Sequence, residues 1–396
     1  MGPMTLPSRR SSPQGGTFLP RALTLALAAI PAAALFTVSG LVRAADPDAF
    51  QMSSDEAGTL FDKAKDSVVQ VRSGDKGYIL AGSGFFIDDQ GTVLTSSTIL
   101  GENKTARVLI HGVEMDAKII GNDPRSGLAM LRVSYDESPS LPLGHTTDLK
   151  TGDGAILIGY PMSLPVASSQ GPISGFEASY LTKIDDATSV KESVAAVERF
   201  ATTHIHANVS ISPGQVGGPL LNSRGEVVGL VATSPDNGKT VYALPAEAMG
   251  KIIADFNLYG RARHGWVGVN VTAGPDTLHD GRTVRVVQIM PGTPASQSGI
   301  QAGDTVMRID SREIYRPSDV LDASFFSHVG GTMIVVVRRD EKLYDYSFAV
   351  IERPQGPTAA NPTTPPVTGT STLSSGSDSS AQGRPVLVNH VVTDSK

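Results

Sequence analysis

The stretch Gly214-Gln215-Val216-Gly217-Gly218-Pro219-Leu220 decides how this chain is interpreted. Its glycines allow two backbone N–H groups to converge on one point, where they can stabilise a developing oxyanion. A nucleophilic side chain is expected at that point, but the residue there is Val216, which has no group that can attack. The stretch therefore indicates a catalytic framework that lacks its nucleophile.

The composition indicates a globular, mainly β protein. The chain has 396 residues, 40% hydrophobic and 18% charged, so it is long enough for two or three domains with separate cores. Its 41 glycines and 26 prolines favour many turns between short runs rich in Val and Ile. A net charge of -6 gives no basic surface for nucleic acid, so no nucleic-acid partner is predicted. The absence of cysteine excludes disulfides and thiolate chemistry, and no cofactor is predicted.

The N-terminal residues have the pattern of an export signal. Arg10 and Arg21 precede an uncharged run over residues 22–42, and Ala44 lies at a small-residue cleavage site. The uncharged run is also nearly long enough to span a bilayer. Residues 1–45 are therefore predicted to be either a cleaved signal peptide or an inner-membrane anchor, with the rest of the chain in the periplasm.

Short extended runs predict two β-barrels in succession. A helix is expected first, over residues 53–65, because Ser53 or Ser54 can cap its N-terminus. Six runs separated by Asp, Gly and Asn turns follow, and then five more, which is the pattern of two closed barrels. The expected strands cover residues 68–71, 78–87, 93–95, 107–110, 117–120 and 128–133, and then 155–158, 173–178, 204–207, 227–231 and 241–244.

A helix is expected to end the double-barrel domain, which we place at residues 53–258. Met249, Ile252, Ile253 and Phe256 fall on one face of a helix that begins at Pro245, so this helix is expected to pack on the second barrel.

A smaller β-rich domain is predicted at residues 264–353. Its strands are expected near residues 267–271, 284–289, 305–309, 333–338 and 346–351, with a helix at 318–326. Residues 354–396 are rich in Pro, Ser and Thr and are predicted to be a disordered tail. Residues 385–392 are an apolar exception that could add a strand to a sheet edge.

The order of the motifs resembles the HtrA family, the DegP-like trypsin-fold serine proteases of the bacterial envelope, in which a PDZ domain follows the protease. The resemblance covers roughly residues 57–352. Its specific marks are Gly82-Ser83-Gly84-Phe85-Phe86-Ile87, Gly91-Thr92-Val93-Leu94-Thr95, Asn122-Asp123-Pro124-Arg125 and the stretch from Ile211 to Gly229. The resemblance implies a trypsin-like double β-barrel followed by a PDZ domain.

The resemblance also implies where a catalytic triad should lie, and residues without the required chemistry occupy all three positions. The family histidine falls on Thr98, whose hydroxyl cannot act as a base near neutral pH. The family aspartate falls on Gly127, so no carboxylate would orient an imidazole. The nucleophile position falls on Val216, and Gly214 and Val216 remain as a vestigial oxyanion loop. The sequence therefore predicts a pseudoprotease with no catalytic residue.

Two other kinds of site could supply catalysis: a substitute serine nucleophile or a two-histidine metal site. Ser210 and Ser212 lie just before the loop, but their strand positions would not carry either hydroxyl to the oxyanion donors. His204 and His206 share a strand face and would permit a two-histidine metal site if a carboxylate lay close by. The preferred interpretation is that both are ordinary barrel histidines with hydrogen-bond partners.

The third domain supplies a predicted peptide site. Gly265-Trp266-Val267-Gly268-Val269 resembles the carboxylate-binding loop and following strand of the family's PDZ domains. A ligand would add as a strand beside residues 267–271, with its last side chain between that strand and the helix. The alternative is that this domain only packs on or regulates the barrels. The predicted peptide-binding residues are Trp266, Val267, Gly268, Val269, Val320, Leu321 and Ser324.

Three functions remain open from the sequence. The preferred one is an inactive HtrA-like protein that binds peptides or unfolded envelope proteins and assembles as a homo-trimer or as a hetero-oligomer with active HtrA-type proteases. The second is an active serine endopeptidase with a non-standard catalytic arrangement. The third is a purely structural subunit of an oligomer.

Overall fold

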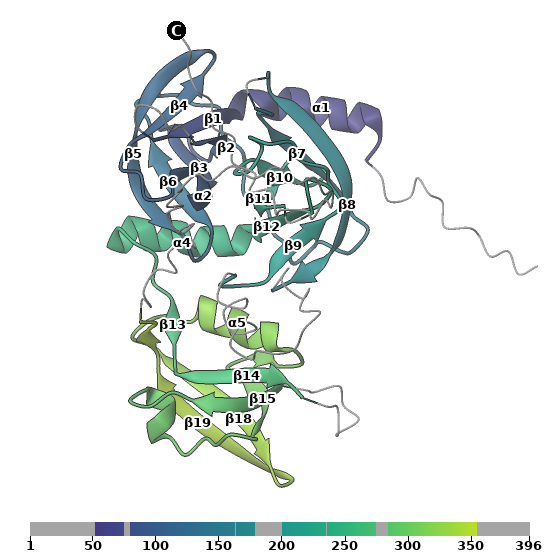
Figure 1. Cartoon of the computed structure of the whole chain (residues 1–396). Coiled ribbons are helices and arrows are strands. Elements are labelled where there is room, and N and C mark those ends of the chain that lie inside the picture. Colours follow the sequence, from purple (N-terminus) through teal and green to yellow (C-terminus); the bar gives the residue numbers. More distant parts are fainter. Residues whose placement is uncertain are drawn as a thin grey trace, which may run out of the picture. The chain divides into compact units, whose positions relative to one another are not determined.

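The computed structural model describes residues 52–74, 80–162, 164–178, 200–234, 236–274 and 284–354 (Figure 1). The predicted signal or anchor at residues 1–45 lies outside these residues, as does the predicted tail apart from Pro354. No helix in the part of the chain that the structure describes is long and apolar enough to cross a membrane.

The first barrel follows helix α1 (Ser54–Ala64), which begins as predicted. Ser53 accepts a hydrogen bond from the Glu56 amide, and Glu56 accepts one from the Ser53 amide, so the two residues form a capping box. The strands close in the order β1-β2-β3-β6-β5-β4 around a buried apolar interior. Their bounds are β1 Val68–Ser73, β2 Leu80–Phe86, β3 Thr92–Ser96, β4 Ala106–Ile110, β5 Val113–Asp123 and β6 Leu128–Arg132, with the short helix α2 at Ser97–Leu100.

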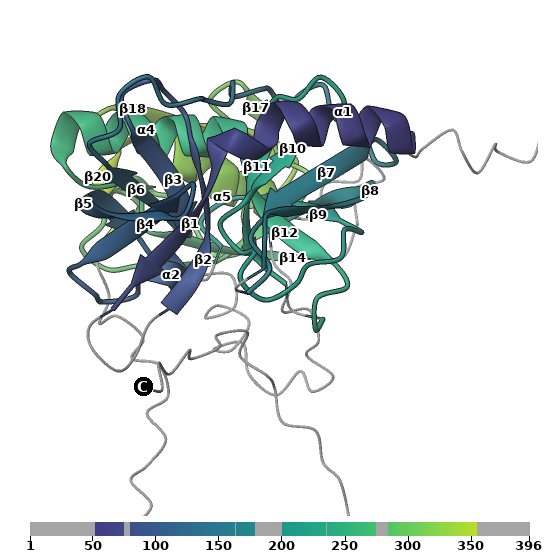
Figure 2. The same ribbon diagram turned by 90° about the horizontal axis from the view of Figure 1, so that it is seen from above.

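The second barrel closes in the order β10-β11-β12-β9-β8-β7 and lies beside the first (Figure 1, Figure 2). Its interior is again apolar and buried, which confirms the predicted pair of barrels. Strand β10 was not predicted. The bounds are β7 Gly154–Gly159, β8 Ala167–Glu177, β9 His204–Ala207, β10 Pro219–Leu221, β11 Val227–Thr233 and β12 Val241–Pro245.

Helix α4 (Ala246–Tyr259) connects the two barrels by packing. Met249, Ile252 and Phe256 are buried, as their spacing predicted. A β-carbon added at Gly121 of β5 would lie 2.3 Å from the Phe256 ring, so α4 also contacts the first barrel. The predicted packing of α4 on the second barrel is therefore confirmed, and α4 contacts the first barrel as well.

The third domain is built on a five-stranded path in the order β14-β15-β16-β18-β19, with β14 and β19 at its two edges. The predicted strand at residues 267–271 begins two residues later, at Val269, because Gly268 has a φ of +87° and breaks the extended conformation after the short strand at Gly265–Trp266. The predicted strand at 346–351 is divided. The elements are β13 Gly265–Trp266, β14 Val269–Ala273, β15 Val284–Ile289, η2 Pro294–Gln297, β16 Thr305–Ile309, β17 Arg312–Glu313, α5 Pro317–Phe326, β18 Thr332–Arg339, β19 Lys342–Ala349 and β20 Ile351–Glu352.

Polar contacts join helix α5 to the segment that leads into β9. The carboxylate of Asp322 accepts hydrogen bonds from the Thr202 hydroxyl at 2.7 Å and from the amide and hydroxyl of Thr203 at 2.7 and 2.8 Å. Asp322 is 9% exposed, so its charge is stabilised by these donors and by the Arg312 guanidinium, 3.6 Å from the carboxylate.

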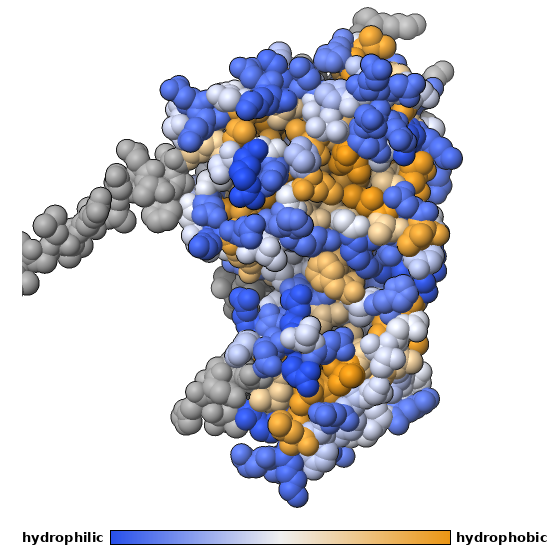
Figure 3. Space-filling model, turned by 180° about the vertical axis from the view of Figure 1, so that it is seen from behind, coloured by the Kyte–Doolittle hydropathy of each residue, from blue (hydrophilic) through white to orange (hydrophobic). Residues whose placement is uncertain are grey.

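The surface carries single exposed apolar side chains, among them Leu258 at 72% and Leu343 at 64% exposure. Figure 3 shows apolar patches interrupted by hydrophilic residues on the face turned away from Figure 1. Isolated exposed apolar residues are normal for a globular protein and do not by themselves mark a binding site.

Candidate functional site

The predicted base position, Thr98, lies in the first turn of α2, directly after β3, and is exposed. Its hydroxyl forms a 2.8 Å hydrogen bond with the hydroxyl of Ser96, so its partner is another uncharged hydroxyl group. The amide of the adjacent Ser97 donates a 2.9 Å hydrogen bond to the carbonyl oxygen of Gly127. The predicted base and orienter positions are therefore neighbours in space.

The predicted orienter position, Gly127, has a φ of +81°. A β-carbon at this position would lie 3.6 Å from the β-carbon of Ala232 on β11, an ordinary van der Waals distance. The site therefore has room for a β-carbon, although the positive φ disfavours any residue other than glycine. It holds no carboxylate that could polarise an imidazole.

The predicted nucleophile position, Val216, is half-buried and packs against the interior of the first barrel. Its carbonyl oxygen accepts a 2.8 Å hydrogen bond from the Ser83 amide. The next residue, Gly217, has a φ of +87°, and a β-carbon there would lie 2.7 Å from the Thr95 hydroxyl and 2.9 Å from the Ser96 amide nitrogen. The structure thus brings Val216 close to the end of β3, where Thr98 and Gly127 also lie.

The oxyanion loop is held by its neighbours. Gly214 has a φ of +94°, and its carbonyl oxygen accepts a 2.8 Å hydrogen bond from the Ser83 hydroxyl. The buried Gln215 accepts a 2.8 Å hydrogen bond from the Ser212 amide. Among the described residues, the amides of Gly214 and Val216 donate no hydrogen bond. Both predicted oxyanion donors are therefore unpaired, although nothing in the loop can attack a substrate.

The alternative nucleophiles have no base beside them. Ser210 and Ser212 are exposed, and neither hydroxyl forms a hydrogen bond within the described part of the chain. Ser83 has a buried hydroxyl, but it donates to the Gly214 carbonyl and accepts from the Tyr160 amide. These hydroxyls lack the paired base that activates a serine.

The two barrel histidines have different surroundings. His204 is fully buried, its Nδ1 lies 2.9 Å from the Thr202 carbonyl oxygen, and its ring contacts Phe200. Burial lowers the pKa of His204 to about 4, so its imidazole is neutral near pH 7. His206 instead stacks on Tyr242. No group of three or more His, Asp or Glu side chains within the described residues is placed to hold a metal ion.

The predicted carboxylate loop has the geometry of a turn that only glycine fits. A β-carbon at Gly268 would lie 2.1 Å from the Thr293 hydroxyl. The carbonyl oxygens of Val267 and Gly268 accept hydrogen bonds from the amides of Ala295 (3.0 Å) and Met290 (2.8 Å). The amides of Val267 and Gly268 donate none within the described ranges. These amides are thus available to a ligand, as a carboxylate site requires.

The predicted groove residues are only partly brought together. Val267, Val269 and Val320 pack at the margin of the third domain's core, between the edge strand β14 and α5. The Ser324 hydroxyl donates a 2.7 Å hydrogen bond to the Gly265 carbonyl, so it braces the loop. The structure differs from the prediction in three respects. The strand edge open to a ligand is Val269–Ala273, and Trp266 pairs with Ile351 in a separate two-stranded sheet. Leu321 is half-buried but belongs to none of the described core clusters.

One buried contact between a histidine and a carboxylate was not predicted from the sequence. His264 Nε2 lies 3.0 Å from the Asp123 carboxylate, and both side chains are largely buried. Burial would raise the pKa of Asp123, but the hydrogen bonds from His264 and Ser126 outweigh burial and hold it below its usual value. Asp123 lies in the Asp-Pro-Arg motif, and no local pattern in the sequence could have indicated a partner 141 residues away.

The fold and these two sites define a trypsin-like double barrel followed by a PDZ domain. The family model for the trypsin-like peptidase domain matches residues 82–230, and that for the PDZ domain matches residues 265–350. The solved structure of the HtrA-type protease AlgW with a tripeptide is 21% identical, covers 76% of this chain and 98% of its own, and gives a TM-score of 0.63. This likeness confirms the predicted fold.

Over part of its length the chain is also similar in sequence to HtrA/DegP-like serine proteases. It is 31% identical over 250 residues to a protein of Hahella chejuensis named "Probable periplasmic serine endoprotease DegP-like", which covers 60% of this chain. It is 27% identical over 277 residues to HhoB of Synechocystis sp., which covers 66% of this chain. The matched region spans 50% and 64% of the length of these two relatives.

Proposed function

We propose that this protein is a catalytically inactive HtrA/DegP-like homologue that binds peptides or unfolded proteins through its PDZ domain. The observation that carries the proposal is the content of the three triad positions, Thr98, Gly127 and Val216, which meet at the end of β3 without a base, a carboxylate or a nucleophile. Because triad members act as a unit, the loss of all three leaves only the small contribution of the oxyanion donors and of binding.

The backbone features that serve binding are retained. The edge strand β14 has one open side, and the turn before it presents the unpaired amides of Val267 and Gly268. A peptide with a free C-terminus would place its carboxylate at these amides and continue as a strand along β14. Catalysis needs particular side chains, whereas this mode of binding needs mainly backbone, so binding can outlast the loss of catalysis.

The same comparison supports the location, and the resemblance to the HtrA family implies the assembly. The Hahella relative is named as periplasmic, and the basic and apolar N-terminal pattern of this chain favours export. We therefore propose a periplasmic or inner-membrane-anchored protein that forms a homo-trimer or joins active HtrA-type proteases.

Peptide binding tests the proposal directly. An apolar decapeptide with a free C-terminal carboxylate is expected to bind the full chain, and the same peptide with an amidated C-terminus is expected to bind at least tenfold more weakly. Gly268→Ala is expected to abolish binding, because its β-carbon would clash with Thr293. Gly303→Ala is the matched control, since Gly303 also has a positive φ (+96°) but no atom within 4 Å of an added β-carbon.

Two results would contradict the proposal. Equal binding of the free and amidated peptides, or none of either, would favour a purely structural subunit. Labelling of any serine of the wild-type protein by a fluorophosphonate probe would show instead an active serine hydrolase with an unrecognised catalytic arrangement.

A further inference from the structure

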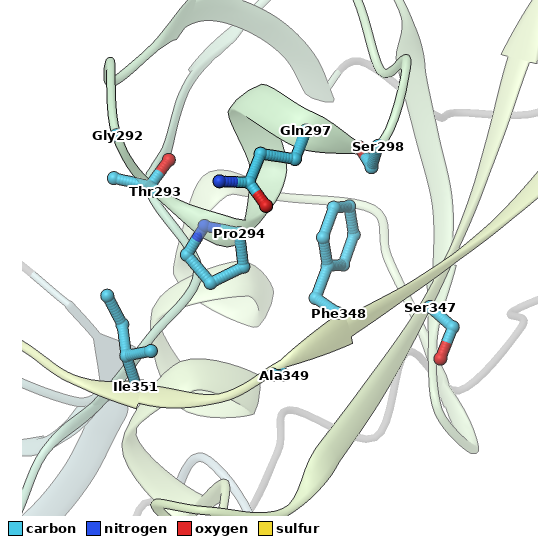
Figure 4. Close-up of a pocket in the computed structure, with 9 residues that line it drawn as sticks. All are labelled: Gly292, Thr293, Pro294, Gln297, Ser298, Ser347, Phe348, Ala349 and Ile351. Atoms are coloured by element: carbon cyan, nitrogen blue, oxygen red, sulfur yellow. The ribbon is translucent and has the colours of Figure 1, made fainter.

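A pocket of about 440 Å³ lies on the PDZ domain beside the edge strand β19, at the edge of the sheet opposite β14 (Figure 4). One wall is formed by η2 and the turn before it, including Pro294 and Gln297. The other wall is the last part of β19, with Ser347, Phe348 and Ala349. This pocket is not part of the predicted carboxylate site.

Within the described residues β19 pairs with β18 alone, and every second residue of β19 points its backbone N–H and C=O groups away from β18. Val350 uses both its N–H and its C=O towards the β18 side, bonding to Gly331 and Gly330. Because backbone groups alternate along a strand, Ala349 and Ser347 direct theirs to the opposite side.

The partner strand gives independent support for this direction. Ile334, which lies opposite Ser347 in the register, bonds through both its N–H and its C=O to Asp310, on the far side of β18. It therefore has no backbone group left for Ser347. Within the described residues, neither Ser347 nor Ala349 has a backbone partner outside this register. The pocket thus contains a short unpaired strand edge.

The pocket is bounded along the strand. The Tyr346 hydroxyl and the Arg339 guanidinium both donate to the Gly299 carbonyl, at 3.1 and 3.2 Å, and fix the chain after η2 against β19 at one end. Ile351 lines the pocket where the chain passes from β19 to β20. Between these ends, Figure 4 shows the Gln297 amide group close to Pro294 and the Phe348 ring beside them. The available edge is two to three residues long and has an amide and an apolar ring as neighbours.

These features select one kind of occupant. No charged residue lines the pocket, so neither an ion nor a terminal carboxylate has a charged partner there. A second copy of the chain would have to bring its own η2, which flanks its β19 in the same way, into the space beside this edge. A single extended segment has no such wall, and its backbone can satisfy the N–H and C=O groups of Ser347 and Ala349.

We infer that the β19 edge beside η2 is a second peptide-binding site, which takes an uncharged extended segment from within an unfolded chain. The segment adds as a strand to Ser347 and Ala349, and small apolar side chains lie against Phe348 and Pro294. This site needs no free C-terminus. The pocket shares Thr293 with the turn at Gly268, but a segment with no free carboxylate cannot use the site proposed at Val267 and Gly268, so a blocked peptide tests the two sites separately.

Amide hydrogen exchange tests the inference on the full chain. The probe is a peptide of alternating Thr and Val residues with both ends blocked, which cannot use the carboxylate site. Its addition is expected to slow exchange of the Ser347 and Ala349 amides at least tenfold and to leave the amides of β14 unchanged. Ala349→Pro removes one of the two outward-directed N–H donors and is therefore expected to weaken binding at least tenfold. The fold should be kept, because an edge strand tolerates proline where its N–H faces outward.

The matched control is Leu343→Pro, which removes another outward-directed N–H of β19 but lies outside the pocket. It is expected to leave binding unchanged. Protection confined to β14, an absence of protection, or full binding by Ala349→Pro would each overturn the inference. Protection of Ser347 that appears without peptide and rises with protein concentration would also overturn it, because the occupant would then be a second copy.

Discussion

The Ser97 amide donates a 2.9 Å hydrogen bond to the carbonyl oxygen of Gly127. This bond connects the residue next to the vacant base position with the vacant orienter position. The backbone that would hold a histidine and an aspartate together is therefore present, and only their side chains are missing. The proposed loss of catalysis would therefore lie in three side chains on an intact backbone framework.

Val216→Ser alone is expected to leave the protein inactive. The new hydroxyl would have no base, since Thr98 and Gly127 are unchanged, and an isolated serine hydroxyl is a weak nucleophile at neutral pH. Casein cleavage and fluorophosphonate labelling would both stay at background. Slow cleavage by this single variant would show that the base or orienter position has been assigned to the wrong residue.

The triple variant Thr98→His, Gly127→Asp, Val216→Ser is expected to regain measurable labelling by the same probe. Its activity should be limited by the positive φ of Gly127, which costs a residue with a side chain about 1–2 kcal/mol. The double variant that keeps Val216 is the control, and it should not be labelled. Equal signals from the two variants would mean that the reactive serine lies elsewhere.

Gly217→Ala is expected to destabilise the fold. The added β-carbon would lie 2.2 Å from the Ser83 carbonyl oxygen, at a φ of +87°, and backbone on both sides prevents relief. A loss of about 2–4 kcal/mol in the free energy of unfolding is expected from such a clash. Gly250→Ala in α4 is the control, because its β-carbon would meet nothing within 4 Å and should stabilise the helix by about 0.8–1 kcal/mol. Chemical denaturation measures both.

The sequence predicted most strands of the barrels because alternating Val and Ile runs between turn residues are a local signal. Strand β10 was missed since Pro219–Leu221 has only three residues and directly follows the glycine-rich loop. Its identity as a strand depends on pairing with β11 and β7, which no local pattern encodes. The break at Gly268 was missed for a similar reason, because its positive φ depends on contact with Thr293.

Some residues of the candidate sites could likewise be predicted from the sequence, whereas others depend on the fold. Motif order was enough to place Thr98, Gly127 and Val216, and the structure brings these positions together. The unpaired edge at Ser347 and Ala349 could not be predicted, because alternation along β19 shows which groups point outward only once the register with β18 is known. The His264–Asp123 pair depends on the three-dimensional fold for the same reason.

Asp322→Ala is expected to loosen the segment that leads into β9. The substitution removes the acceptor of three hydrogen bonds and leaves donors of Thr202 and Thr203 unpaired, at a cost of about 2–4 kcal/mol. Amide exchange of the Thr203 N–H should become faster. Asp345→Ala, an exposed position on β19, is the control and should change neither stability nor exchange. If Asp322→Ala leaves the exchange of Thr203 unaltered, Asp322 does not hold this segment.

The stability of the second barrel is expected to fall between about pH 6.5 and pH 4 because of His204. In the folded state burial lowers the pKa of His204 to about 4, whereas in the unfolded chain it keeps its ordinary value near 6.5. Between these values the unfolded state binds the additional proton, so acidification favours unfolding, by about 3 kcal/mol in total for a shift of this size. The contribution is fully present above pH 6.5 and lost once the pH has fallen through 4.

His204→Phe keeps a ring against Phe200 and removes the titrating group, and its unfolding free energy should therefore depend less on pH over this range. His111→Phe, on the hairpin between β4 and β5, is the control and should keep the wild-type pH dependence. Denaturant unfolding at pH 7, 5.5 and 4 measures the difference, and identical slopes for wild type and His204→Phe would show that His204 does not set the acid sensitivity.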